Sequence, residues 1–142
     1  RAAAHVKYGL QDKLYMGNLD ARRDWGYAPE YVEAMWMMLQ QEQPIDYVIG
    51  TGEMHTVREL VEVAFDHVGL DWRDHVEHDQ RYERPAEVEA LQADPTRANR
   101  EMGWTHRTSF DGLVRLMVDA EIKALEDKAS GQLKKVSLRS GA

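Results

Sequence analysis

Cysteine is absent from all 142 residues, which excludes disulfides and thiolate metal sites. Long apolar runs are also absent, because no stretch approaches the ~20 residues that a membrane span needs. The residues after Arg1 form no apolar signal-peptide core. Basic residues are the minority, 18 against 25 acidic ones, and the net charge of −7 disfavours general nucleic-acid binding. We therefore expect a cytoplasmic protein that binds neither nucleic acid nor membranes.

The composition that is present predicts a folded globular domain. Hydrophobic residues make up 43% of the chain and charged residues 30%, which argues against disorder. A chain of this length can bury a core of its own. The first residue is Arg and not Met, so we expect the chain to begin inside a longer reading frame.

Local patterns predict a mixed α/β fold with several helices and few, short strands. The expected strands are 14–16, 47–49 and 75–79. The expected helices are the end of one within 1–10, then 29–41, 56–68, 95–103 and one that begins after Ser109. Residues 20–24 are expected to form a charged loop. Such sparse strands cannot build a self-contained parallel sheet.

Helix ends are marked by capping residues. Thr56 and Glu59 have the spacing of a capping box, and Gly69 is expected to end that helix. The helix over 29–41 is unusually apolar, and we expect its apolar residues to share one face. That face comprises Tyr31, Val32, Met35, Trp36 and Leu39. The simpler interpretation is ordinary core; the alternative is packing against another domain or a partner subunit.

Two further patterns favour ordinary structure over a ligand site. Gly50-Thr51-Gly52 follows an expected strand and precedes a helix, as in a dinucleotide-binding fingerprint. His55 stands where the third glycine should be, so a plain turn is favoured over a cofactor loop. His75 and His78 would face opposite sides of a strand and have no convincing third ligand, so a metal site is not favoured.

The most informative feature is a pair of arginine-centred segments, 17–26 and 81–88. Guanidinium groups match phosphate oxygens in two-pronged geometry and remain charged at physiological pH. Two such loops could clamp a diphosphate between them. The alternative is that these arginines are solvated or weakly paired with carboxylates. The available carboxylates are Asp20, Asp24 and Glu87.

The order of these segments resembles the GDP-mannose 4,6-dehydratases, which are extended short-chain dehydrogenases. The matching segments are 14–26, 31–39, 51–53, 55–59, 81–88, 94–98 and 102–104. The resemblance runs from residue 1 to about residue 125. It implies a Rossmann-type parent fold that carries NADP, plus a smaller C-terminal substrate domain. Residues 1–128 would be the substrate-binding portion, and 129–142 a flexible tail.

The resemblance also implies roles for five residues. Arg23 and Arg84 would contact the diphosphate of GDP, and Glu87 would bind a ribose hydroxyl. Gly17 and Asn18 would line the nucleotide pocket. The sequence departs from the family at residue 83, where Glu replaces the usual aromatic residue. A carboxylate beside a diphosphate is unfavourable unless it points away.

The family's catalytic machinery has no counterpart in this sequence. None of the six tyrosines is followed by Lys four positions later, and no complete glycine-rich fingerprint is present. The resemblance implies that a Tyr-x-x-x-Lys pair and NADP are needed for the dehydration. We therefore assign no catalytic, cofactor-binding or metal-binding residue to this chain.

The predicted function is part of a GDP-mannose 4,6-dehydratase, a lyase that converts GDP-mannose to GDP-4-keto-6-deoxymannose. This chain would bind the GDP moiety, and alone it would be inactive. NADP would be bound by the rest of the parent enzyme. The expected partners are GDP-mannose, copies of the same chain, or a Rossmann portion. Two alternatives stay open: a non-catalytic nucleotide-sugar binding or assembly module, and the substrate portion of a related GDP-sugar reductase.

Overall fold

A computed structural model describes residues 1–83, 88 and 90–131 of the chain. The helices are α1 (Ala2–Lys7), α2 (Ala28–Met38), α3 (Val57–Asp66), α4 (Thr96–Met102) and α5 (Phe110–Ala129). The strands are β1 (Leu14–Met16), β2 (Arg22–Arg23), β3 (His55–Thr56), β4 (Val76–His78) and β5 (Ala90–Leu91). The 3-10 turns are η1 (Trp72–Asp74) and η2 (Gln80–Tyr82). The predicted class, α/β with few short strands and several helices, is confirmed.

The strands form two small sheets that join remote parts of the chain. β1 pairs with β4 in parallel, with Leu14 opposite Val76. β2 lies between antiparallel β3 and parallel β5. The expected loop over 20–24 is therefore corrected: Arg22 and Arg23 are a central strand. A two-residue strand of arginines has no apolar alternation, so only its distant partners could have revealed it.

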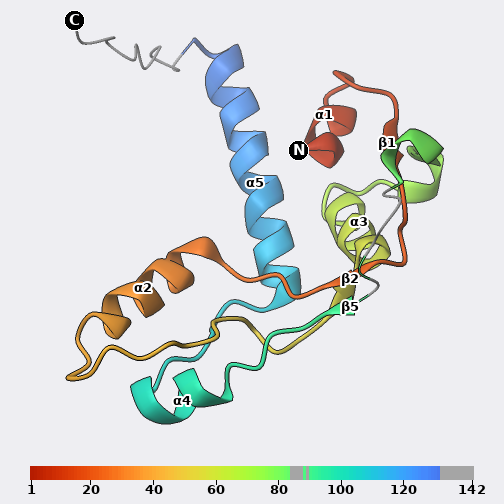
Figure 1. The fold of residues 1–142 in the computed structure, drawn as a ribbon. Helices are drawn as coiled ribbons and strands as arrows, with labels where there is room; N and C mark the ends of the chain where they lie inside the picture. The colour runs from red at the N-terminus through yellow and green to blue at the C-terminus, as the bar shows by residue number, and fades with distance from the viewer. Residues whose placement is uncertain (84–87, 89, 132–142) are drawn as a thin grey trace, which may run out of the picture.

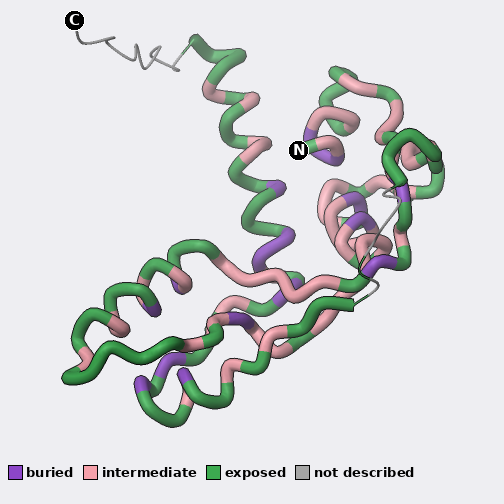
Figure 2. Tube along the Cα trace, in the orientation of Figure 1, coloured by how far each residue is buried: buried purple, intermediate pink, exposed green. Residues whose placement is uncertain are grey.

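Two hydrophobic clusters lie at opposite ends of the molecule (Figure 1, Figure 2). One cluster is built from Ala3, Val61 and Phe65, where α1 and α3 meet. The other surrounds Trp104, whose indole Nε1 donates to the Glu30 carbonyl oxygen at 3.0 Å. Figure 1 shows α5 between these two ends. Its buried residues are Phe110, Leu113, Val114 and Val118.

The predicted capping signals are confirmed. Thr56 Oγ1 accepts from the Glu59 N–H at 3.0 Å, and the Glu59 carboxylate accepts from the Thr56 N–H at 2.5 Å. Ser109 Oγ accepts from the Gly112 N–H at 3.2 Å and so begins α5. α4 begins at Thr96, one residue later than expected, and ends at Gly103 with a left-handed φ of +70°. Local hydrogen bonds thus set these helix ends.

The predicted strand over 47–49 is wrong, because no strand of the described residues pairs with it. Side chains of this segment still alternate: Tyr47 and Ile49 pack against the Trp104 cluster, while Val48 is exposed. A strand exists only when a neighbour accepts and donates its backbone hydrogen bonds. The pattern was recognised, but the neighbour it needs is not among the described residues.

The apolar face expected on the helix over 29–41 is largely exposed. α2 buries Glu30 and Ala34, while Val32, Met35, Trp36 and Leu39 are exposed; Leu39 is 82% exposed. The helix turns its Tyr31, Ala34 and Met38 side toward Trp104 instead. The ordinary-core interpretation therefore fails for Met35, Trp36 and Leu39. Figure 2 shows this helix largely in the exposed colour.

α5 continues to Ala129, and residues 132–142 lie outside the described part of the chain. The boundary after residue 128 and the flexible tail over 129–142 therefore stay predictions. Within the described residues, no helix combines the length and apolar character that crossing a bilayer demands.

Candidate functional site

The two arginine-centred segments lie side by side, joined at two places. On one side, β1 pairs with β4, and the Asp79 N–H donates to the Met16 carbonyl at 2.9 Å. On the other side, β2 pairs with β5, with Arg23 opposite Leu91. Described residues in and beside the two segments are therefore paired, and the clamp formed by two arginine loops stays a prediction. Arg84 and Glu87 lie outside the described residues, so their predicted roles stay predictions.

Gly17 is the point of closest approach between the segments. A Cβ added there would overlap the carbonyl oxygen of Tyr82 and lie 3.1 Å from the Glu83 nitrogen. Asn18 follows and caps the turn, since its Oδ1 accepts from the Asp20 N–H at 2.9 Å. A glycine is needed because any side chain would push η2 away from the loop after β1.

A pocket of about 280 Å³ lies beside this contact. Its lining residues are Tyr15, Met16, Gly17, Asn18, Ala21, Arg23, Val57 and Tyr82. Three of the five predicted site residues, Gly17, Asn18 and Arg23, are thus brought into one pocket. Sequence reasoning missed Tyr15 and Tyr82, two exposed aromatic rings. Both rings could have been found from the sequence, because Tyr15 lies in segment 14–26 and Tyr82 in segment 81–88, which carried the resemblance.

Arg23 is held at the edge of this pocket by main-chain acceptors. Its Nη1 donates to the carbonyl oxygens of Arg22 at 2.6 Å and Val88 at 2.7 Å. Val88 belongs to the second arginine-centred segment. The guanidinium of the first segment therefore bonds directly to the second, and no carboxylate accepts these two bonds. Both acceptors are main-chain carbonyls, and the guanidinium stays charged at physiological pH.

Asp20, one of the carboxylates expected to pair with the arginines of the two segments, has a different partner. Asp20 accepts from Arg58 Nη2 at 2.9 Å. Glu83 accepts from His78 Nε2 at 2.9 Å and lines a separate hollow of about 550 Å³, with Arg58 and Asp20. Glu83 does not line the pocket that contains Arg23. The unfavourable placement of a carboxylate beside Arg23 is therefore avoided at residue 83.

The main-chain N–H groups of the Gly50-Thr51-Gly52 turn bind a carboxylate of the same chain, that of Asp24. The Thr51 and Gly52 N–H groups each donate to the Asp24 carboxylate at 2.9 Å. Burial raises the pKa of Asp24, but hydrogen bonds from Thr51, Gly52 and Ala93 outweigh it, and the net pKa is lowered. The N–H donors that a cofactor phosphate would use in a dinucleotide loop are thus occupied by Asp24.

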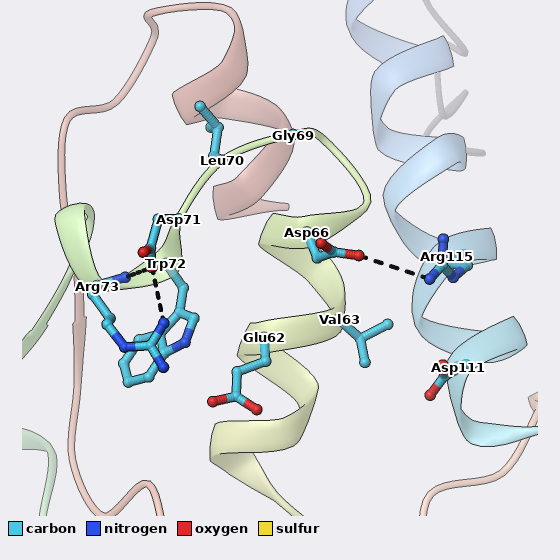
Figure 3. A pocket seen from close by; sticks show the side chains of 10 residues that line it. All are labelled: Glu62, Val63, Asp66, Gly69, Leu70, Asp71, Trp72, Arg73, Asp111 and Arg115. Atoms are coloured by element: carbon cyan, nitrogen blue, oxygen red, sulfur yellow. Dashed lines mark hydrogen bonds and ion pairs between the residues drawn. The ribbon is translucent and has the colours of Figure 1, made fainter.

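A wider hollow of about 780 Å³ lies between α3, η1 and α5 and contains none of the predicted site residues (Figure 3). Its charges largely pair with one another: Arg73 Nη1 lies 3.2 Å from Asp71 Oδ1, and Arg115 Nη2 lies 3.9 Å from Asp66 Oδ2. With acidic residues in excess and arginines that already have acidic partners, this hollow is a poor match for a diphosphate.

The histidines considered for metal binding have other partners. His75 stacks on Phe65 with ring centroids 5.8 Å apart, and His78 bonds to Glu83. In the part of the chain that the structure describes, no three His, Asp or Glu side chains gather as a metal site would require.

Comparisons with known proteins find relatives that match most of this chain. GDP-mannose 4,6 dehydratase 1 of Arabidopsis thaliana is 53% identical over 123 residues, covering 87% of this chain and 34% of that protein. The human GDP-mannose 4,6 dehydratase is 44% identical over 142 residues, covering 88% of this chain and 38% of that protein. The chain thus spans little more than a third of the length of these relatives.

Solved structures show the same fold at lower identity. RMD from Pseudomonas aeruginosa, complexed with NADPH, has a TM-score of 0.76 and 22% identity, covering 86% of this chain and 40% of that chain. dTDP-glucose 4,6-dehydratase from Bacillus anthracis, in complex with NAD, has a TM-score of 0.74 and 19% identity, covering 87% and 38%. These likenesses show that the chain shares the fold of the matched parts of these two structures. The family model described as GDP-mannose 4,6 dehydratase matches residues 1–117, and the chain therefore belongs to the GDP-mannose 4,6-dehydratase family.

Proposed function

We propose that this chain is the substrate-binding portion of a GDP-mannose 4,6-dehydratase and binds the GDP moiety of GDP-mannose. The observation that carries the proposal is the pocket formed by Gly17, Asn18 and Arg23, bounded by two segments that the family pattern assigns to the nucleotide. The curated relatives carry the dehydratase name, which favours a dehydratase over a related GDP-sugar reductase. The product of the complete enzyme is GDP-4-keto-6-deoxymannose.

The proposed binding chemistry divides the ligand among residues of different character. Arg23 supplies a permanent positive charge at the pocket edge, suited to the diphosphate. Arg84 would supply a second guanidinium and Glu87 an acceptor for a ribose hydroxyl, both within 84–87. Tyr15 and Tyr82 offer aromatic faces on which a base or sugar ring can pack.

NADP does not fit the described residues of this chain. The glycine turn at 50–52 already holds Asp24, and the sequence has no Tyr-x-x-x-Lys pair. In the proposal, NADP and the hydride and proton transfers belong to the part of the family enzymes that this chain does not span. This chain's residues orient the nucleotide, so that the distant sugar ring can meet the reacting groups.

Association with a Rossmann portion or with further copies of the chain is part of the same proposal. The exposed face of α2 carries Val32, Met35, Trp36 and Leu39, and the unpaired segment 45–49 lies in the same half of the molecule. Apolar side chains gathered in this way on one helix mark an interaction surface. A partner that supplies a strand could pair with 45–49 and cover α2 at the same time.

Titration calorimetry of the full chain with GDP, GMP and pyrophosphate tests the proposal. We expect GDP to bind with a dissociation constant of roughly 0.1–1 mM, because an incomplete site leaves much of the ligand in water. Arg23→Ala should weaken both GDP and pyrophosphate, whereas Arg73→Ala, in the separate hollow, should not. Incubation with GDP-mannose and NADP should yield no 4-keto product. Absence of GDP binding by a folded chain, or an unaltered affinity in Arg23→Ala, would refute the site.

A further inference from the structure

Asp24 carries an unusual set of hydrogen bonds immediately beside Arg23. Its Oδ1 accepts from the Thr51 N–H at 2.9 Å and from Thr51 Oγ1 at 2.7 Å. Its Oδ2 accepts from the Gly52 N–H at 2.9 Å and the Ala93 N–H at 3.3 Å. All four donors are main-chain or hydroxyl groups, and they come from two segments remote from Asp24. The half-buried carboxylate thus joins three parts of the chain.

These contacts continue the β2–β5 pairing with a side chain. Arg22 and Arg23 pair with Ala90 and Leu91 through the main chain, and Asp24 then reaches Ala93. At the other end of β5, Arg23 Nη1 donates to the Val88 carbonyl. β5 is therefore held on one side by the Asp24 carboxylate and on the other by the guanidinium that lines the pocket. The two neighbouring side chains act on the same strand.

The packing around Asp24 leaves little freedom for this arrangement to shift. A Cβ added at Gly50 would overlap the Ala93 side chain and lie 3.0 Å from Asp24 Oδ2. Gln92 Nε2 also donates to the Gly52 carbonyl, which ties β5 to the same turn. The turn at 50–52, β2 and β5 therefore form one hydrogen-bonded unit with the carboxylate at its centre.

A second carboxylate has similar chemistry but a different location. Glu30 accepts from the Arg107 and Thr108 N–H groups, each at 3.2 Å, and from Thr108 Oγ1 at 2.8 Å. It lies beside Trp104 and lines neither of the hollows next to Gly17. Glu30 therefore joins segments away from these hollows, and it provides a matched comparison for Asp24.

We propose that Asp24 is a positioning residue for Arg23: its carboxylate fixes β2 and β5, so that the guanidinium is held at the pocket edge before a phosphate-bearing ligand arrives. This inference rests on the proposed GDP site. An arginine that is ordered in advance loses less conformational entropy when it binds phosphate. Without the carboxylate, the four donors would lose their acceptor and β2 would move relative to β5.

The test measures pyrophosphate and GDP binding by calorimetry, at a temperature where circular dichroism shows each variant folded. Asp24→Asn should weaken pyrophosphate by about three- to tenfold, the effect of ordering one long side chain during binding. Asp24→Glu, which keeps the charge, should recover part of the affinity. Glu30→Gln should lower the melting temperature as well, but change pyrophosphate affinity less than about twofold.

A double-mutant cycle with Arg23→Ala separates positioning from general destabilisation. In the Arg23→Ala background, Asp24→Asn should change pyrophosphate affinity less than about twofold, because the side chain that it positions is gone. If Asp24→Asn does not fold, Thr51→Val keeps the carboxylate but removes the hydroxyl donor to Asp24, together with the bonds of that hydroxyl to the Glu53 main chain, and should weaken pyrophosphate in the same direction.

The outcomes distinguish this inference from the proposed function on which it rests. Equal effects of Asp24→Asn and Glu30→Gln on affinity, or an undiminished effect of Asp24→Asn without Arg23, would overturn the positioning role while leaving the GDP site intact. If neither Arg23→Ala nor Asp24→Asn lowers the affinity, the proposed GDP site is refuted. The positioning role is supported if Asp24→Asn weakens pyrophosphate binding in the wild-type background and leaves it unchanged in the Arg23→Ala background.

Discussion

Gly17 and Tyr82 are 65 residues apart in sequence, and a Cβ added at Gly17 would overlap the Tyr82 carbonyl. Gly17→Ala should lower the free energy of unfolding by about 1–3 kcal/mol, since the new methyl group must push the Tyr82 carbonyl away. The same movement should widen the Arg23 pocket and weaken GDP. Urea unfolding and calorimetry measure the two effects.

Gly112→Ala is the matched control for that substitution. Gly112 lies in the first turn of α5, and the atom nearest to an added Cβ is the Ser109 Oγ at 3.1 Å, a side-chain and not a main-chain atom. Alanine favours helix over glycine by up to ~1 kcal/mol, so this variant should be neutral or more stable. If Gly17→Ala is as stable as Gly112→Ala, the Tyr82 carbonyl can move aside without a measurable loss of unfolding free energy.

Asp24 also gives the molecule a pH dependence of predictable sign. Its pKa in the folded chain is lowered below the ordinary carboxyl value of about 3.9. A lowered folded-state pKa stabilises the fold above the unfolded-state pKa, and this contribution is lost as the pH falls through the folded-state value. The difference in unfolding free energy between wild type and Asp24→Asn should therefore shrink below about pH 4.

Equilibrium urea unfolding at several pH values between about 6 and 3 measures that difference. Subtracting the variant removes the contributions of other carboxylates with lowered pKa, such as Glu59 and Asp94. If the difference in unfolding free energy between wild type and Asp24→Asn stays constant down to pH 3, the pKa of Asp24 is not lowered by folding. The hydrogen bonds that Asp24 accepts would then not stabilise its charged form.

Single residues of the site could be predicted only where a resemblance named them. Gly17, Asn18 and Arg23 share a pocket as expected, and their roles remain to be tested. Asp24 was considered only as a partner for an arginine, yet it accepts from main-chain N–H groups. Nearly every residue type has a main-chain N–H group, so the residue types alone do not show which carboxylate will accept hydrogen bonds from the main chain.

At the scale of elements, helix starts have the strongest local signal. The capping box of α3 satisfies two main-chain N–H groups with two side chains. Thr56→Ala should therefore cost about 1 kcal/mol of unfolding free energy. Thr56→Ser keeps the hydroxyl and serves as the control in the same urea experiment. Equal losses in both variants would mean that the Thr56 methyl group, and not the cap, stabilises this helix.

Strands were less predictable because their evidence lies far away in the chain. β1 and β4 were expected from short β-prone runs, but β2, β3 and β5 have two residues each and no alternation. Each exists because a remote segment offers hydrogen bonds in register. The segment 47–49 shows the opposite case: it has the alternation, but no neighbour among the described residues.

At the scale of the whole molecule, the two hydrophobic clusters differ in how well the helices around them are covered by other elements. The cluster of Ala3, Val61 and Phe65 has α5 packed beside it, whereas none of the residues that the structure describes covers the outer side of α2. Trp36 is 62% exposed and Leu39 more so. Because water disfavours contiguous apolar surface, we expect the chain at micromolar concentration to form dimers or larger species through this face.

Sedimentation velocity tests this expectation with charge substitutions. The double variant Trp36→Glu/Leu39→Glu should shift the distribution toward monomer, because carboxylates buried in an interface lose hydration without gaining partners. Met117→Glu, on the exposed side of α5, changes an apolar residue of 45% exposure away from α2 and should leave association unaltered. Calorimetric GDP affinity should be equal in both variants, since neither position lines the Arg23 pocket. A monomeric wild-type chain with cooperative unfolding would show that the exposed face of α2 tolerates water without a partner.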